Sequence, residues 1–185
     1  MKKSAANVDI VTGMMLFLIL AVTVFLEFKL TQYMVTAANV EDALAVSNLA
    51  SAIIDVEEYG KSHHIWITDC EKAFHIYRDA LGSNLKLDGE FNSSNNNFLV
   101  GPVKIRLYSV YNVIGDAIEI HSFDGYGNEI ALNYGKIGEV FTPDNVPVEH
   151  TTIYSKISFQ VQGPAGLIIP GEKEKSIDIV RCNSE

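Results

Sequence analysis

The most apolar stretch of the chain lies near its N-terminus and runs from Ile10 to Leu26. It contains no charged residue, and Asp9 and Glu27 flank it on either side. A helix needs about 20 residues to cross the hydrocarbon core of a bilayer, and this stretch reaches that length once its flank up to Leu30 is included. The pattern therefore predicts a membrane-spanning helix that anchors the protein.

Helix-forming residues continue beyond the apolar stretch as far as Tyr59, and neither glycine nor proline occurs between Gly13 and Gly60. Both residue types are unfavourable inside helices, so their absence favours an unbroken helix. We expect one helix from Ile10 to Tyr59, about 75 Å long at about 1.5 Å per residue. Gly60 is expected to cap its C-terminal end.

Apolar residues in the outer part of this helix recur at helical spacing in two slightly rotated stripes. The helix is therefore expected to lie partly on its own domain and to be partly free to pack against neighbours. Alanines along it would let another helix approach closely, but alanine is also simply a good helix former, and both interpretations stay open. The first stripe is Tyr33, Ala37, Val40 and Leu44, and the second is Val46, Leu49, Ile53 and Val56.

A second, shorter helix is predicted from about Asp69 to Leu81. Thr68 and Glu71 have the spacing of a capping box, in which each side chain bonds the backbone N–H of the other residue. Gly82 is expected to end this helix.

After Gly82 the apolar residues alternate with polar ones at a period of two. Such alternation is typical of antiparallel strands that have one face on a core and the other in water. The segment from Asp124 to Asn128 is rich in turn residues and is expected to connect two of these strands as a hairpin. The alternating runs are residues 103–112, 118–121, 130–134, 153–161 and 177–179.

The predicted fold class is α+β, with a long N-terminal transmembrane helix that continues as an exposed stalk helix, a short second helix, and an antiparallel β-sheet of four to five strands. Residues 1–30 would form the cytoplasmic N-terminus and the transmembrane helix, and residues 31–60 the extracytoplasmic stalk helix. Residues 61–185 would form a small α+β globular domain, for which the remaining length suffices.

Charge narrows the possible partners. The formal net charge of the chain is −9, and the eleven basic and twenty-one acidic residues after position 30 leave −10 on the outer part. Such a surface repels nucleic acid and anionic lipid, so we exclude nucleic acid as a partner.

The position of the basic residues indicates the orientation in the membrane. Lys2 and Lys3 precede the anchor, whereas the region after it is acidic, which predicts a cytoplasmic N-terminus and an extracytoplasmic C-terminal domain in the cell membrane. An alternative is a cleaved secretory signal, because Val35-Thr36-Ala37 resembles a small-residue cleavage site. The apolar stretch is longer than a usual signal core and ends well before that site, which favours the anchor.

The two cysteines, Cys70 and Cys182, both fall in the part that this topology places in an oxidising compartment. They are predicted to form one disulfide across the globular domain, the alternative being two unrelated thiols. A bond between them would close a loop of just over 100 residues, worth about 4 to 5 kcal/mol in the chain-entropy model.

No strong catalytic or metal-binding motif is present in the sequence. His63 and His64 are adjacent, and adjacent side chains point apart on a helix or a strand, so exposed loop histidines are favoured over a metal site. The segment from Asp124 to Glu129 offers closely spaced oxygen ligands but lacks the order of an EF-hand loop, which favours a plain turn over a calcium site. We therefore expect no cofactor and no enzymatic activity.

The order of elements resembles that of type IV pilin-like subunits: a short basic start, an apolar helix that continues as an exposed helix, and then an antiparallel sheet. The closest likeness is to TadE-like minor pilins, or pseudopilins, of tight-adherence pilus systems. The residues that carry it are Ala5-Ala6-Asn7-Val8-Asp9-Ile10 at the start and, near the end, a strand at 157–162, a Pro/Gly-containing turn at 163–171 and a last strand at 177–182.

The resemblance implies roles for residues at the start of the chain. Asp9 would stand where such families have a glutamate that neutralises the new N-terminal amine of a neighbouring subunit, with processing between Ser4 and Ala5. This sequence has Asp in place of Glu, and Ser4 where glycine is usual. The alternatives are an unprocessed chain, and an Asp9 that caps the helix at the membrane face.

These inferences together predict a minor pilin-like structural component of a Tad/type IV pilus or a related secretion or adhesion apparatus. It would act by helix packing and surface contacts, with other pilin-like subunits, pilus-assembly membrane proteins and the lipid bilayer as partners. The alternative is a membrane-tethered extracytoplasmic ligand-binding or sensory domain, with its site on the sheet face and the loops around Asn92 and Asp124.

Overall fold

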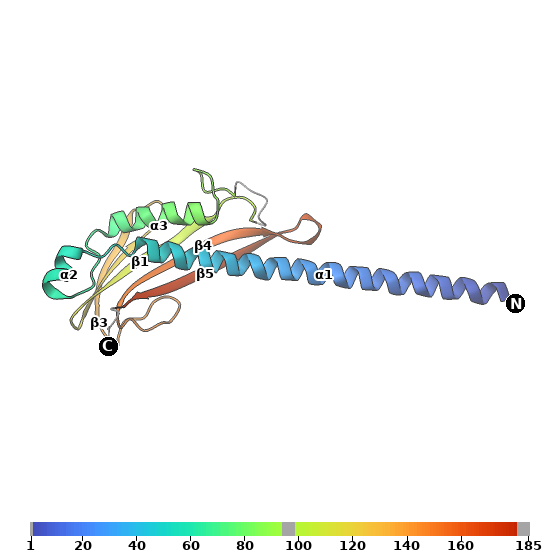
Figure 1. The fold of residues 1–185 in the computed structure, drawn as a ribbon, viewed down its shortest axis with the longest axis horizontal. Coiled ribbons are helices and arrows are strands. Elements are labelled where there is room, and N and C mark those ends of the chain that lie inside the picture. Colours follow the sequence, from blue (N-terminus) through green and yellow to red (C-terminus); the bar gives the residue numbers. More distant parts are fainter. Residues whose placement is uncertain (1, 94–98, 181–185) are drawn as a thin grey trace.

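Helix α1 (Lys2–Ser51) begins the fold, and its N-terminal half projects far beyond the other elements (Figure 1). The computed structural model describes residues 2–93 and 99–180, with the side chains of residues 2–8 and of Ala165 left out of the description. Within these ranges it is an α+β fold with a long apolar helix and an antiparallel sheet. This agrees with the predicted fold class.

The prediction of one helix as far as Tyr59 was wrong, because α1 ends at Ser51 and a separate helix α2 (Val56–Ser62) follows. Asp55 caps α2, since its carboxylate accepts the backbone N–H groups of Glu57 and Glu58, both at 3.0 Å. An N-cap residue has non-helical backbone angles, so this cap starts a new helix instead of extending the old one.

Gly60 lies inside α2 and does not end a helix. The residue that caps α2 at its C-terminus is His63, whose φ of 58° lies in the left-handed region and whose N–H donates to the carbonyl of Tyr59. The geometry is that of a usual helix C-cap, with histidine in the place where glycine was expected.

Helix α3 (Cys70–Asn84) corresponds to the second predicted helix but starts and ends later. Its N-cap is Asp69 and not Thr68, because the Asp69 carboxylate accepts the N–H of Lys72 at 2.9 Å. Gly82 lies within the helix, which continues to Asn84.

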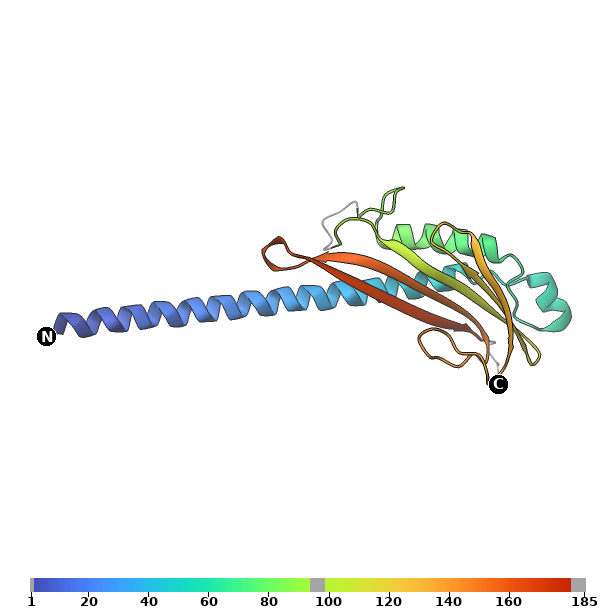
Figure 2. The same ribbon diagram turned by 180° about the vertical axis from the view of Figure 1, so that it is seen from behind.

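The sheet confirms the strand predictions. Its five described strands are all antiparallel and stand in the order β3-β2-β1-β4-β5 (Figures 1 and 2). The expected hairpin at Asp124–Asn128 connects β2 and β3. The strands are β1 (Lys104–Ile114), β2 (Ala117–Phe123), β3 (Glu129–Lys136), β4 (Thr151–Gln162) and β5 (Ile168–Ile179).

The last strand is the one whose extent was most underestimated, since β5 begins at Ile168 and only its end at Ile177 was predicted. Its side chains do not alternate between buried and exposed, so a period of two gives little signal there. Pairing with β4 along its whole length defines it instead.

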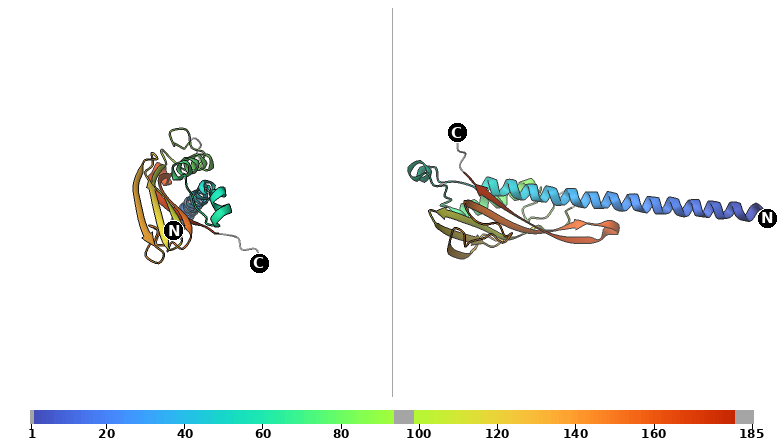
Figure 3. Two further views of the ribbon diagram at one scale, coloured as in Figure 1. Left: turned by 90° about the vertical axis from the view of Figure 1, so that its left-hand side faces the viewer. Right: turned by 90° about the horizontal axis from the view of Figure 1, so that it is seen from below.

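The C-terminal part of α1 and all of α3 cover one face of the sheet, as the end-on view in Figure 3 shows. Between these layers lies the main core, in which the rings of Tyr77 and Tyr108 stand 4.8 Å apart and Phe74 meets Tyr108 edge-on at 5.7 Å. On the opposite face, Val148 and the partly buried Val140 cover a smaller apolar cluster.

Candidate functional site

The N-terminal half of α1 exposes its apolar side chains. Phe17 is 72% exposed and Leu20 is 62% exposed, and the most hydrophobic 18-residue window of the helix has a mean hydropathy of 2.4 with none of it buried inside the protein. Among the described residues, α1 is the one helix long and apolar enough to cross a membrane. A helix buried in the core of a soluble protein would have its apolar side chains covered, and here they are not.

The C-terminal half of α1 packs on the domain through one buried face. Along the chain, the residues of this face are apolar at first and become polar from Ser47 onward. Val40 and Leu44 of the first predicted stripe are buried, whereas Tyr33 at its start is 37% exposed. One turn further on, Ser47, Asn48 and Ser51 are fully buried. The helix therefore enters the domain with side chains that need hydrogen-bond partners.

Those partners come from three different elements. The Asn48 amide donates to the carbonyl of Lys175 on β5 at 2.9 Å, and Ser47 Oγ accepts the amide of Asn84 on α3 at 3.1 Å. The hydroxyl of Tyr108 on β1 donates to Ser51 Oγ at 3.0 Å. These directional bonds fix both the rotation and the depth of α1 on the sheet.

Three of the four members of the second predicted stripe do not pack on the domain. Val46, Leu49 and Val56 are 54%, 63% and 74% exposed, while small polar residues take the buried positions. A pattern based on hydrophobicity places serine and asparagine on the side that faces water. It therefore does not identify the face of α1 that contacts the domain here.

An ion-pair cluster adds a further tie between α1 and β5. The two carboxylate oxygens of Glu41 lie 3.1 Å from Lys173 Nζ and 3.0 Å from Lys175 Nζ. A hydrogen bond from Lys175, and to a smaller extent one from Lys173, holds the pKa of Glu41 below its ordinary value. The cluster lies close to the surface, so its contribution to stability is small beside that of the buried contacts.

The face of α1 opposite the buried one carries residues spaced alternately by four and three along nearly the whole helix. This spacing is that of the a and d positions of a coiled coil, and ten of the twelve positions hold apolar residues, Thr31 and Asp42 being the polar ones, which suits packing against another helix. We call this set the exposed stripe; Ala45 is half-buried and the others are exposed. Its members are Ile10, Met14, Phe17, Ala21, Val24, Phe28, Thr31, Val35, Ala38, Asp42, Ala45 and Leu49.

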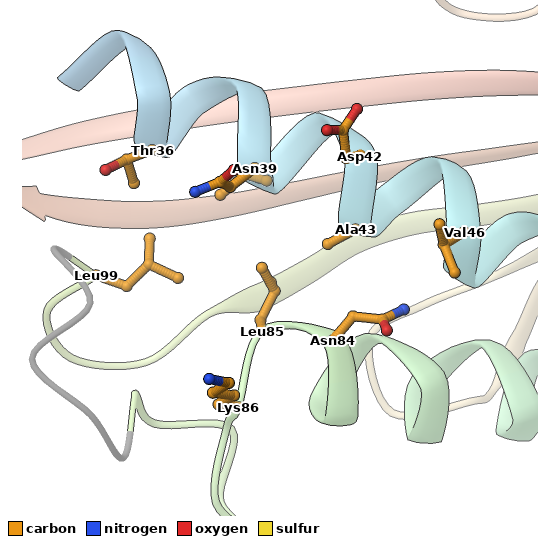
Figure 4. Close-up of a pocket in the computed structure, with 10 residues that line it drawn as sticks. Thr36, Asn39, Asp42, Ala43, Val46, Asn84, Leu85, Lys86 and Leu99 are labelled. Carbon is orange, nitrogen blue, oxygen red and sulfur yellow. The ribbon is translucent and has the colours of Figure 1, made fainter. Parts of the chain in front are cut away.

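A groove of about 520 Å³ runs beside this stripe, between α1 and the chain that leaves α3 (Figure 4). Apolar side chains, among them Val40, Leu85 and Leu99, line its inner part. Asn39, Asp42, Asn84 and Lys86 supply polar groups to its lining.

Asp9 lies within α1 and its side chain is exposed. Because the helix already begins at Lys2, Asp9 is an interior helical residue, and the alternative of a helix N-cap was wrong. The backbone of Ser4 and Ala5 belongs to the first turns of α1, and the processing between them stays a prediction. The secretory cleavage site at 35–37 also falls inside α1, where Thr36 is buried against the domain.

Cys70 is buried at the start of α3, and its thiol donates to the carbonyl of Ile67 at 3.3 Å. Burial raises the pKa of this thiol to about 12. Cys182 lies outside the described residues, so the disulfide stays a prediction.

A polar cluster that no motif of the sequence predicts lies on β2 and β3. His121 Nδ1 is 2.6 Å from a carboxylate oxygen of Glu129, and its Nε2 is 3.5 Å from Glu119. His121, Glu129 and Cys70 border one hollow, to which Asp69 and Glu71 also contribute, so that a thiol, an imidazole and carboxylates lie around one space. The high pKa of the Cys70 thiol keeps it protonated, and a protonated thiol is a poor nucleophile.

The other candidate residues have structural partners. The carboxylate of Asp124 accepts the N–H groups of Tyr126 and Asn128 at 2.9 Å and the side-chain amide of Asn128 at 2.9 Å. These bonds lower the pKa of Asp124 and close the hairpin. Residues 2–93 and 99–180 contain no group of three His, Cys, Asp or Glu side chains arranged to hold a metal ion.

No family model, curated protein or solved structure matches this chain. The likeness to pilin-like subunits therefore stays a resemblance of architecture and of two short stretches of residues.

Proposed function

We propose that this protein is a non-enzymatic, minor pilin-like component of a Tad/type IV pilus or a related secretion or adhesion apparatus. It works by helix packing within and just outside the membrane, and by contacts of its acidic outer surface. Its partners are other pilin-like subunits and membrane proteins of pilus assembly. The N-terminus is cytoplasmic and the α+β domain extracytoplasmic.

The observation that carries this proposal is the exposed stripe of α1. One side of the helix is locked onto the domain by Leu44, Asn48 and Ser51, and the opposite side keeps a coiled-coil spacing from Ile10 to Leu49. A simple anchor needs an apolar segment within the membrane. It does not need a stripe of apolar residues at coiled-coil spacing that continues for about fifteen residues beyond that segment. A subunit that packs against other helices requires such a face.

Helix packing in a membrane favours small residues that let backbones approach, with larger side chains beside them. Ala21, Ala38 and Ala45 of the exposed stripe supply such sites. In this arrangement Asp9 serves at the cytoplasmic end, where its carboxylate neutralises a cationic group of a neighbouring subunit.

Substitutions on two exposed faces of α1 test the proposal. Val35→Glu or Ala38→Glu places a charge in the exposed stripe and should abolish co-purification of the detergent-solubilised protein with other filament subunits. Met34→Glu, at a position that is 63% exposed on a neighbouring face, is the matched control and should leave co-purification intact. A strictly monomeric wild-type protein whose deletion leaves surface filaments unchanged would contradict the proposal.

A second candidate function, a membrane-tethered ligand-binding or sensory domain, is favoured by the groove of Figure 4. Its mixed lining of apolar and polar side chains suits a small amphipathic ligand. Thermal-shift measurements with a panel of amino acids, sugars and nucleotides would test this reading. A ligand that stabilises the wild type but not the Asp42→Ala variant would support it.

A further inference from the structure

The hairpin that joins β4 and β5 extends beyond the rest of the sheet, along α1 and toward its N-terminus (Figures 1 and 2). Pairing of β1 with β4 begins at Lys104 and Ser158, while β4 and β5 stay paired to their ends at Gln162 and Ile168. The 3-10 turn Pro164–Gly166 closes the hairpin. We call residues 163–169 the hairpin tip.

The hairpin tip exposes large apolar side chains that nothing in the described chain covers. Leu167 is 65% exposed, Ile168 is 56% exposed and Ile169 is 36% exposed. No charged residue occurs between Lys156 and Glu172, in a chain of which 20% is charged. An exposed apolar loop on an acidic domain indicates a surface that meets something other than water.

The contacts between α1 and β5 fix the level of the tip along the helix. Glu41 pairs with Lys173, and Leu167 lies six residues beyond Lys173, which is about 20 Å at about 3.4 Å per strand residue. The same length of helix takes about 13 residues at about 1.5 Å each. The hairpin runs beside the helix (Figures 1 and 3). Counting about 13 residues back from Glu41 therefore places the tip near the level of Phe28.

This is the level at which α1 would leave the bilayer. The uncharged stretch of the helix ends at Leu26, and Glu27 and Lys29 follow. The uncharged part of the domain therefore stands beside the end of the membrane-spanning segment. The first charged residue of β5, Glu172, lies five residues beyond Leu167, which corresponds to about three turns of α1 further out.

We propose that the hairpin tip inserts into the interfacial layer of the leaflet on the domain's side, as a second membrane contact beside α1. The inference rests on α1 spanning the membrane, as the proposed function also does. The occupant of the apolar surface is lipid, because the tip is uncharged, apolar and level with the interface. Two contacts with one bilayer, joined by the Glu41 cluster, fix the tilt of the domain and the direction in which the exposed stripe faces.

Quenching of tryptophan fluorescence by brominated lipid tests this contact. The native chain has one tryptophan, Trp66, four residues after α2, and α2 lies at the end of the domain away from the tip (Figure 1). Leu167→Trp in a Trp66→Phe background therefore reports on the tip alone. The full-length protein is placed, one molecule per disc, in phosphatidylcholine nanodiscs brominated near the headgroup. The tip residue should lose about half of its emission, because an interfacial segment lies roughly 5–10 Å deep, beside the bromines.

Two further measurements show whether a negative result concerns the hairpin tip alone or the membrane-spanning helix as well. Phe17→Trp in the same background reports on the span with bromines placed deep in the acyl chains, and wild-type Trp66 should stay unquenched. Quenching of Phe17→Trp without quenching of Leu167→Trp would overturn the membrane contact of the tip and leave the membrane-spanning helix intact. If the Leu167→Trp emission is blue-shifted but not quenched, the tip contacts protein and not lipid, which also overturns the inference. If Phe17→Trp is not quenched, α1 does not span the bilayer, and the proposed function fails together with this inference.

Discussion

The two halves of α1 belong to one continuous helix but face different surroundings. Around Leu20 the large apolar side chains are exposed on every side, whereas around Leu44 one face is buried and three polar residues of that face are hydrogen-bonded to the domain. Apolar content is therefore a poor guide to which half contacts the protein. The half that packs on the domain is the more polar one, because specific docking needs directional partners.

The largest difference between the halves should appear with one substitution made in each. Leu44→Ala should lower the free energy of unfolding of the domain by about 2–5 kcal/mol, because it removes a fully buried side chain from the core. Leu20→Ala, the matched control, should leave that free energy unchanged. Denaturant unfolding of the full-length protein in detergent, followed by Trp66 fluorescence, measures both. Equal effects would contradict the division of α1 into two halves.

The polar contacts should matter less than the core, but measurably. Asn48→Ala should destabilise the domain by about 1–3 kcal/mol, because it leaves the partly buried carbonyl of Lys175 without the side-chain amide that donates to it. Asn39→Ala, at an exposed position on the same helix, should have little effect. The same unfolding experiment compares the two variants, and a neutral Asn48→Ala would mean that the amide does not fix α1 on the sheet.

The smallest effect is expected from the Glu41 cluster. Glu41→Gln should cost about 0.5–1 kcal/mol at neutral pH, since the pair is partly exposed. The folded pKa of Glu41 is lowered, so its contribution is fully present above the ordinary value of 4.5 and is lost as the pH falls through the lowered folded value. Wild type and variant should therefore converge in stability as the pH falls from 4.5 through the lowered folded pKa of Glu41. The exposed Glu57–Lys61 pair of α2 is the control, and Glu57→Gln should change stability less at every pH.

Much of the fold followed from the sequence because its signals are periodic. The apolar stretch Ile10–Leu26 and the alternating runs of the sheet were found with the right types of element. The break at residues 52–55 was missed because it depends on a contact made in the folded protein, the bond from Tyr108 to Ser51, and on the cap at Asp55. Such a break needs neither glycine nor proline.

The candidate site was only partly predictable for a related reason. The buried face at Ser47, Asn48 and Ser51 is polar, and its partners lie up to 127 residues away in the chain. The coiled-coil spacing of the exposed stripe is present in the sequence, but the choice of this face over the others requires knowledge of which side is covered. His121 and Glu119 come together with Glu129 only through the pairing of β2 with β3.

The central claim is that the exposed stripe of α1 is the face that contacts other subunits. A cysteine scan across α1 in native membranes tests this claim most directly. Single cysteines are placed at each position from 28 to 42 in a Cys70→Ala, Cys182→Ser background, and the yield of disulfide-linked dimers or adducts is measured after mild oxidation. The yield should peak at 28, 31, 35, 38 and 42 and fall to background at Met34, Ala37 and Glu41. Uniform yields, an absence of cross-links in assembled material, or peaks on the Val40 face would contradict the account.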